Sequence, residues 1–212
     1  MAVKEKQDAM LHAIIRVVGK SGFADLKMDD FIKIMPASRS TVYRYFNSRE
    51  SVIEAVVDEY VDYIERFSVP TDLIIPAEWI AGFQEQLKQS IIFNGNISQQ
   101  FLADLETDYP DEYRRLQQAI NDHDERDRKF YLDGQEFGIF NKQDYRLWML
   151  QDQVMVPKLM DPAFVFARNW TLKDALSNYA QMKAQQVLTP KFLSQFTLDF
   201  LDPIIEKISQ QY

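Results

Sequence analysis

Apolar residues recur along most of the chain at the three- and four-residue spacing of amphipathic helices. The first such segment, residues 4–20, places Leu11, Ile14, Ile15 and Val18 on one face. No segment alternates with the two-residue period of a strand, so the predicted fold is all-α. Later helices are expected over residues 28–35, 38–46, 47–67, 77–93, 98–107, 112–132, 143–160, 171–187 and 190–209.

The clearest break is "SVPTDLIIP", residues 68–76, which holds two prolines in nine residues. Asn47 followed by Glu50 is typical of a capping box at a helix start. We expect a head of three helices over residues 1–48 and a helical body over 49–212. Residues 47–67 would form the helix that connects them.

Charge is unevenly divided along the 212 residues, whose net charge is −8. The first 50 residues hold nine basic and six acidic residues, a net +3, and the remainder holds 15 and 26, a net −11. A basic head on an acidic body fits a protein that touches phosphates with one end only. No apolar run approaches the roughly 20 residues that span a bilayer, and no signal peptide is evident, so we expect a cytoplasmic protein without a membrane partner.

The segment "KIMPASRSTVYRYFNSRES", residues 33–51, concentrates arginines, hydroxyls and tyrosines. On a helix over 38–46, Val42 and Phe46 would face inward, leaving outward-facing side chains suited to bases and phosphates. Ser38 is a good N-cap for this helix. The residues alone leave two interpretations equally open: DNA readout, or an ordinary amphipathic helix pair with solvated charges. The outward-facing residues are Arg39, Ser40, Tyr43 and Arg44.

Over about residues 9–60, "GFADLKMDDFIKIMPASRSTVYRYFNSRESVIEAVVDEY" resembles the tetracycline-repressor (TetR/AcrR-type) family of bacterial regulators. "GQEFGIFNKQD", residues 134–144, is a weaker similarity to a segment that precedes the family's late helices. The resemblance implies a homodimer that places recognition helices in successive major grooves of double-stranded DNA. It also implies a C-terminal domain that binds a small-molecule effector, and dimerisation through the helices near 143–160 and 171–187.

The resemblance also assigns DNA contacts residue by residue. Pro36 stands where the family usually has glycine, so the turn must close without the positive φ that glycine allows. Proline also moves Met35 out of the helical region. The contacts fall on Ser38, Arg39, Ser40, Tyr43 and Arg44 for bases or phosphates, on Thr41 and Tyr45 for phosphates, and on Lys27 for the DNA backbone.

Four residues of the body are candidates for effector binding. His123 and Asp127 interrupt the apolar stripe of residues 112–132 one turn apart, so they either point into a pocket or form a pair at the edge of the core. Asp152, near Trp148 on the stripe of residues 143–160, is either a pocket acid that selects a cationic ligand or a hydrogen-bonding partner between helices.

These patterns favour a dimeric DNA-binding repressor that a small molecule releases. The alternative keeps the DNA-binding head but makes the body a protein-interaction or assembly module without a small-molecule pocket. The chain has no cysteine, two histidines, and no Gly-rich phosphate loop or paired-carboxylate motif. We therefore expect no enzyme, no catalytic residues, no metal site and no cofactor.

Overall fold

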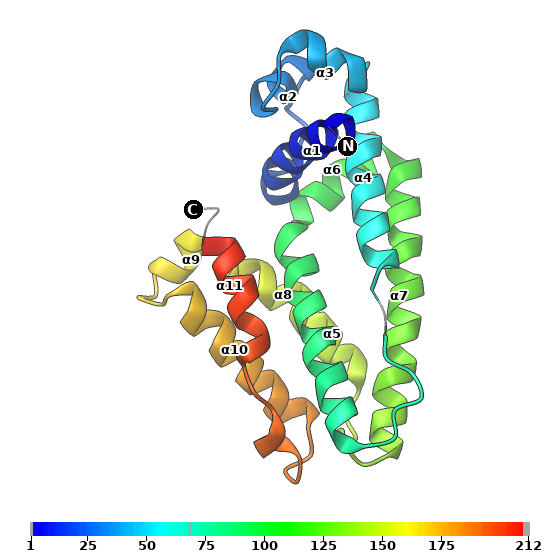
Figure 1. Ribbon diagram of the computed structural model, residues 1–212, viewed down its shortest axis with the longest axis vertical. Coiled ribbons are helices and arrows are strands. Elements are labelled where there is room, and N and C mark those ends of the chain that lie inside the picture. The colour runs from blue at the N-terminus through cyan, green and yellow to red at the C-terminus, as the bar shows by residue number, and fades with distance from the viewer. Residues whose placement is uncertain (1, 68, 210–212) are drawn as a thin grey trace. The chain divides into compact units, whose positions relative to one another are not determined.

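The computed structural model describes residues 2–67 and 69–209, and within these ranges the chain forms eleven α-helices and two short 3-10 helices (Figure 1). An isolated bridge joins Phe140 and Leu188. The predicted all-α fold is confirmed. None of the helices in the described ranges has both the length and the apolar character needed to cross a bilayer.

The chain forms two compact units. Unit 1 comprises Met1–Phe67 and Asn96–His123, and unit 2 comprises Ser68–Gly95 and Asp124–Tyr212. In unit 1, α1 packs against α2, α4 and α6 through its buried apolar face. The helices of unit 1 are α1 (Ala2–Ser21), α2 (Met28–Ile34), α3 (Arg39–Tyr45), α4 (Arg49–Glu65), α6 (Gln99–Asp108) and the first part of α7 (Pro110–Glu136).

Two glycines fix the end of α1. Gly22 adopts a φ of +77° where the helix ends. This left-handed conformation is strained for a residue with a side chain but not for glycine. A Cβ on Gly19 would lie 2.3 Å from the carbonyl oxygen of Asn96, so only glycine permits this close approach. Across the same contact, the Ser98 N–H donates to Gly19 O at 2.7 Å and the Tyr60 hydroxyl donates to Asn96 O at 2.9 Å.

Unit 2 is built around an aromatic core. Phe140 packs edge-on against Trp79 and Phe130, at ring-centroid distances of 5.9 and 5.2 Å. The segment after α7 is then tied to the end of α10, because Asn141 donates its N–H to Val187 O at 2.7 Å. The helices of unit 2 are α5 (Pro76–Asn96) up to Gly95, the rest of α7, α8 (Tyr145–Leu159), α9 (Pro162–Phe166), α10 (Leu172–Val187), α11 (Asp202–Ser209), and the 3-10 helices Leu193–Gln195 and Asp199–Leu201.

The prediction of one helix over residues 190–209 is wrong. The segment forms the two 3-10 helices and then α11, which starts at Asp202. A continuous helix is interrupted at Phe196, whose φ of −78° and ψ of 128° are extended. Further on, Pro203 lacks the N–H that such a helix would donate to Asp199 O, whereas in the first turn of α11 that N–H needs no partner. Apolar residues of this segment are nonetheless buried, namely Phe192, Phe196, Leu201 and Ile204.

The predicted start of the connecting helix is also wrong in detail. Ser48, rather than Asn47, is the N-cap of α4, and Ser51 completes the capping box in place of Glu50. The Ser48 hydroxyl accepts the Ser51 N–H at 3.3 Å, and the Ser51 hydroxyl accepts the Ser48 N–H at 3.2 Å. The predicted break at 68–76 lies between α4 and α5, and Ser68 itself is outside the described residues.

Candidate nucleic-acid interface

Helix α3 has one buried face and one exposed polar face. Val42 and Phe46, one turn apart, are 0% and 2% exposed and anchor the helix to the rest of the head. Burying these two side chains fixes how the helix is rotated about its own axis, and with it which residues point outward. Those residues are Arg39, Ser40, Tyr43 and Arg44, all exposed as predicted, and the N-cap Ser38 is exposed beside them.

Hydroxyl groups cluster at the start of α3. Ser38 is the N-cap and accepts the Thr41 N–H at 3.3 Å, as its position in the sequence predicts. Its hydroxyl oxygen lies 2.9 Å from that of Thr41 and 3.1 Å from that of Ser40. Three hydroxyls that can both donate and accept therefore lie together beside the exposed face.

The two arginines of α3 lie over tyrosine rings. The Arg39 guanidinium is 5.6 Å from the Tyr43 ring centroid, and that of Arg44 is 5.2 Å from the Tyr45 ring centroid. Arg39 also forms an ion pair with Asp29 of α2 at 2.9 Å, with both side chains more than half exposed. Exposed pairs of this kind contribute little, about 0–1 kcal/mol, so a phosphate or base can replace Asp29 as the partner.

Pro36 shapes the turn between α2 and α3. The last turn of α2 closes with the Met35 N–H donating to Phe31 O at 3.0 Å, and Met35 is then extended, with φ −72° and ψ 134°. The Ala37 N–H donates to Met35 O at 2.8 Å. The described residues of this turn include none with positive φ. The turn therefore closes through an extended residue before proline, as the sequence predicts.

At the start of α2, Lys27 occupies the N-cap position and its side chain is exposed. Its backbone N–H donates to the Asp30 carboxylate at 3.1 Å, and the Lys33 ammonium donates to the same carboxylate at 2.8 Å. The hydrogen bond from Lys33, followed by that from the Lys27 N–H, lowers the pKa of Asp30. Of the two acidic residues that follow Lys27, Asp29 and Asp30, it is Asp30 that forms an ion pair with Lys33.

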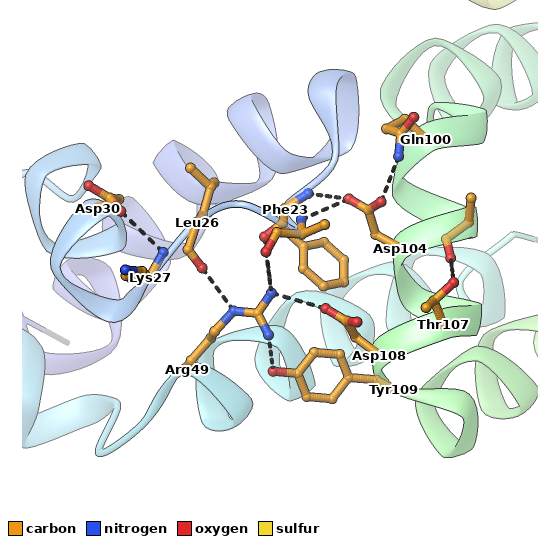
Figure 2. Close-up of polar contacts among 12 residues, drawn as sticks. Phe23, Leu26, Lys27, Asp30, Arg49, Gln100, Asp104, Thr107, Asp108 and Tyr109 are labelled. Carbon is orange, nitrogen blue, oxygen red and sulfur yellow. Dashed lines mark hydrogen bonds and ion pairs between the residues drawn. The ribbon is translucent and has the colours of Figure 1, made fainter.

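Arg49, the first residue of α4, holds the loop between α1 and α2 (Figure 2). Its Nε donates to Leu26 O at 2.9 Å and its Nη2 donates to Phe23 O at 3.0 Å. The same guanidinium reaches the Tyr109 hydroxyl at 2.8 Å and the Asp108 carboxylate at 3.3 Å. Arg49 thus joins α4, the α1–α2 loop and the end of α6 within unit 1. The sequence did not predict this role, because the partners of Arg49 lie 23 to 60 residues away along the chain.

Asp104 of α6 holds the same loop from the other side (Figure 2). Its Oδ2 accepts the N–H groups of Phe23 and Ala24 at 2.5 and 2.9 Å, while Gln100 donates to its Oδ1 at 2.6 Å. Burial acts to raise the pKa of Asp104, but these hydrogen bonds and the charge of Arg49 outweigh it and the pKa is lowered. The loop that leads into α2 is therefore held through its backbone by both an anion and a cation.

The residues predicted to bind an effector occupy different environments. His123 is half-buried in unit 1, with its ring edge-on to Phe67 at 5.3 Å, and Asp127 is 8% exposed in unit 2. Trp148 and Asp152 are buried in α8. Within the residues that the structure describes, no group of three or more His, Asp or Glu side chains is arranged to hold a metal ion.

Asp152 is the centre of a buried polar cluster in unit 2. It accepts hydrogen bonds from Lys183 Nζ at 2.7 Å, from Ser90 Oγ at 2.9 Å and from the Tyr179 hydroxyl. Lys183, which is 0% exposed, also donates to the carbonyl oxygen of Trp148. Burial lowers the pKa of Lys183, while the neighbouring carboxylate of Asp152 acts in the opposite direction. This arrangement links α5, α8 and α10.

Lys183 was not identified from the sequence, although a signal was present. It falls on the same helical face as the buried residues Leu176, Ala180 and Val187. A lysine on such a stripe needs a buried anionic partner, and Asp152 was the one acid that interrupted the stripe of the preceding long helix.

Unit 2 also contains a cavity of about 490 Å³. Its walls come from the loop 69–73, the start of α5 and the second half of α7. His123, Asp127, Trp148 and Asp152 do not line this cavity.

Comparison with known proteins agrees with this architecture. A TetR transcriptional regulator from Chloroflexus aurantiacus is 18% identical, with a TM-score of 0.57 over 89% of this chain and 99% of that one. A Rhodococcus sp. protein described as a TetR-family transcriptional regulator is 15% identical, with a TM-score of 0.53 over 86% of this chain and 98% of that one. No protein-family model and no curated protein sequence matches. The chain has the fold of TetR-family regulators.

Proposed function

We propose that the chain is a DNA-binding transcriptional regulator whose helix α3 enters the major groove of an operator. The observation that carries the proposal is the exposed polar face of α3, fixed in orientation by the buried Val42 and Phe46. A helix with one anchored apolar face and one polar face is what groove recognition requires. A role in transcription places the protein in the cytoplasm with its operator.

In this proposal the arginines of α3 provide base readout. Arg39 and Arg44 each carry a planar fork that matches the acceptors of guanine, and one good bidentate contact discriminates by about 1–3 kcal/mol. Arg39 would exchange Asp29 for DNA, while the Tyr43 hydroxyl reaches bases or phosphates. The remaining contacts would be to phosphates, from the hydroxyls of Ser38, Ser40, Thr41 and Tyr45 and from Lys27.

We also propose a homodimer formed through α8 and α10. On α8, Leu147, Leu150 and Val154 are 65%, 52% and 62% exposed and lie on one face, three and four residues apart. A two-fold axis can cover such a stripe with its own copy. In helix-turn-helix dimers generally, the symmetry places the recognition helices roughly 34–36 Å apart, in successive major grooves.

The proposed regulator is a repressor that a small molecule releases from DNA. The ligand would bind the body and favour a head spacing that does not fit the operator, to the extent that its affinity differs between the two states. His123 of unit 1 and, separately, Asp127, Asp152 and Trp148 of unit 2 are candidates for this binding. Asp152 would have to exchange its hydrogen bond from Lys183 for one from the ligand. The exposed stripe of α8 equally supports the alternative, in which the body binds a partner protein.

The test is selection of duplexes from random DNA by the full-length protein at low salt. We expect one sequence with two similar halves to be enriched, and the double variant Arg39→Ala/Arg44→Ala to enrich none. Recovery of sequences at the same frequencies as in the starting pool would contradict DNA recognition. A metabolite screen for release of the selected duplex then separates a ligand-responsive repressor from an assembly module.

A further inference from the structure

The two arginines of α3 have similar surroundings except for one acidic residue. Arg39 and Arg44 are both exposed, and their guanidinium groups lie 5.6 and 5.2 Å from the centroids of tyrosine rings. The carboxylate of Asp29, in the first turn of α2, lies 2.9 Å from Nη2 of Arg39. Arg44 forms no ion pair within the residues that the structure describes. Arg44 is therefore a natural reference for what Asp29 does to Arg39.

The second acidic residue of α2 has other partners. Asp30 accepts a hydrogen bond from the Lys33 ammonium at 2.8 Å and one from the Lys27 N–H at 3.1 Å. The charge of Lys33 also acts on Asp29, but its ammonium bonds to Asp30. Asp29 is thus the acid of α2 that forms an ion pair with α3, through Arg39.

The carboxylate lies at the part of the Arg39 guanidinium that a base or phosphate would use. An arginine makes bidentate contacts through two neighbouring N–H groups, either those of Nη1 and Nη2 or those of Nε and Nη2. Nη2 belongs to both pairs, and it is the nitrogen beside Asp29. A DNA acceptor on either pair therefore lies next to a like charge unless the carboxylate moves away.

The pair is exposed, so DNA can break it at a small cost. The side chains of Arg39 and Asp29 are 62% and 59% exposed. Pairs this exposed contribute little to stability, and losing one corresponds to about a two- to fivefold change in an equilibrium constant. Binding through Arg39 carries this cost and the repulsion of the freed carboxylate, whereas binding through Arg44 carries neither.

From these observations we infer that Asp29 competes with DNA for Arg39 and thereby lowers the affinity of the protein for its operator. Asp29 acts through Arg39 and needs no contact of its own with DNA. The inference rests on the proposed function, because it requires that α3 binds DNA. The two fail in different ways: without DNA recognition the wild type selects no duplex, whereas without competition it selects one that Asp29 does not affect through Arg39.

The experiment measures the affinity of the full-length protein for the selected duplex at one salt concentration. Asp29→Asn should tighten binding at least about threefold, because Arg39 is released and one repelling charge is removed. In an Arg39→Ala background the same substitution should tighten binding less than about twofold, since general repulsion alone is relieved. In an Arg44→Ala background the full gain of at least about threefold should remain.

The control for removing one acidic charge is Asp25→Asn, in the exposed loop between α1 and α2, which should change affinity less than about twofold. Circular dichroism checks folding, and Asp29→Ser removes the same carboxylate independently. Equal gains from Asp29→Asn in the Arg39→Ala and Arg44→Ala backgrounds would overturn the inference, as would no gain in the wild-type background. A loss of affinity would also overturn it, because Asp29 would then hold Arg39 in its DNA-binding position.

Discussion

Arg49 in unit 1 and Lys183 in unit 2 each hold several helices together, but they do so in opposite surroundings. The Arg49 side chain is 22% exposed and donates mainly to backbone carbonyls of the α1–α2 loop. The Lys183 side chain is 0% exposed and depends on the carboxylate of Asp152 and one carbonyl. Water can replace some partners of Arg49 but none of Lys183, so the contacts that hold the α1–α2 loop are the more easily rearranged.

The largest change in stability is expected at the buried cluster of Lys183 and Asp152. Lys183→Met should reduce the free energy of unfolding by about 3–5 kcal/mol, because it leaves the Asp152 carboxylate buried without its cation. Urea denaturation measures the loss. Lys173→Met, at an exposed pair with Asp202, should change stability by less than about 1 kcal/mol.

A double variant distinguishes an uncompensated charge from simple loss of packing. Lys183→Met/Asp152→Leu removes both charges, so it should regain much of the stability that Lys183→Met loses. If the double variant is less stable than the single one, the cluster stabilises unit 2 by more than charge compensation.

The next largest change in stability is expected at the partly exposed contacts of Arg49 with the α1–α2 loop. Arg49→Lys should cost about 1–3 kcal/mol, because an ammonium cannot donate along the two directions that Leu26 and Phe23 require. Urea denaturation again measures it, with Arg114→Lys on the exposed surface of α7 as the matched control. A loss as large as that of Lys183→Met would remove the proposed contrast between the two clusters.

Acid should weaken the hydrogen bonds by which Asp104 holds the same loop as Arg49. Since the pKa of Asp104 is lower in the folded state than its ordinary value of about 3.9, its carboxylate stabilises the folded state above that pH. The contribution is lost as the pH falls through the folded-state pKa. Asp104→Asn should therefore be less stable than the wild type by about 1–2 kcal/mol at pH 7, and the difference should shrink below about pH 4. A difference that stays constant from pH 7 to pH 3 would contradict this role.

The smallest change in stability is expected at Pro36, in the turn between α2 and α3. Pro36→Gly should lower stability by about 0.4–1 kcal/mol, because glycine gives the unfolded chain more freedom. Operator preference should not change, since the buried Val42 and Phe46 orient α3. Repeating the duplex selection with this variant checks it, and a shifted sequence preference would mean that Pro36 itself sets the angle of α3.

The head was predictable because its organisation is local. Ser38, Val42 and Phe46 lie within nine residues, and helical spacing alone places the cap and the two anchors. The extended backbone of Met35 also followed from the proline after it. Arg49 was harder to place, since its partners Phe23 and Tyr109 lie 26 and 60 residues away.

The body was less predictable because its features depend on segments distant in sequence. Asp152 and Lys183 are 31 residues apart and meet only when α8 packs on α10. The cavity likewise combines a loop, α5 and α7, so spacing within any one helix could not reveal it. The helix predicted over 190–209 is wrong because the backbone is extended at Phe196, which the apolar spacing of the segment does not reveal.

The central claim, that the exposed face of α3 recognises DNA, is tested most directly by the affinity of Arg44→Ala for the selected duplex. Loss of a bidentate base contact should weaken binding by about 5- to 150-fold, corresponding to about 1–3 kcal/mol. Arg114→Ala, which removes an equal charge from the exposed surface of α7, should bind within about twofold of the wild type. Equal affinities of Arg44→Ala and the wild type at the same salt concentration would contradict the claim.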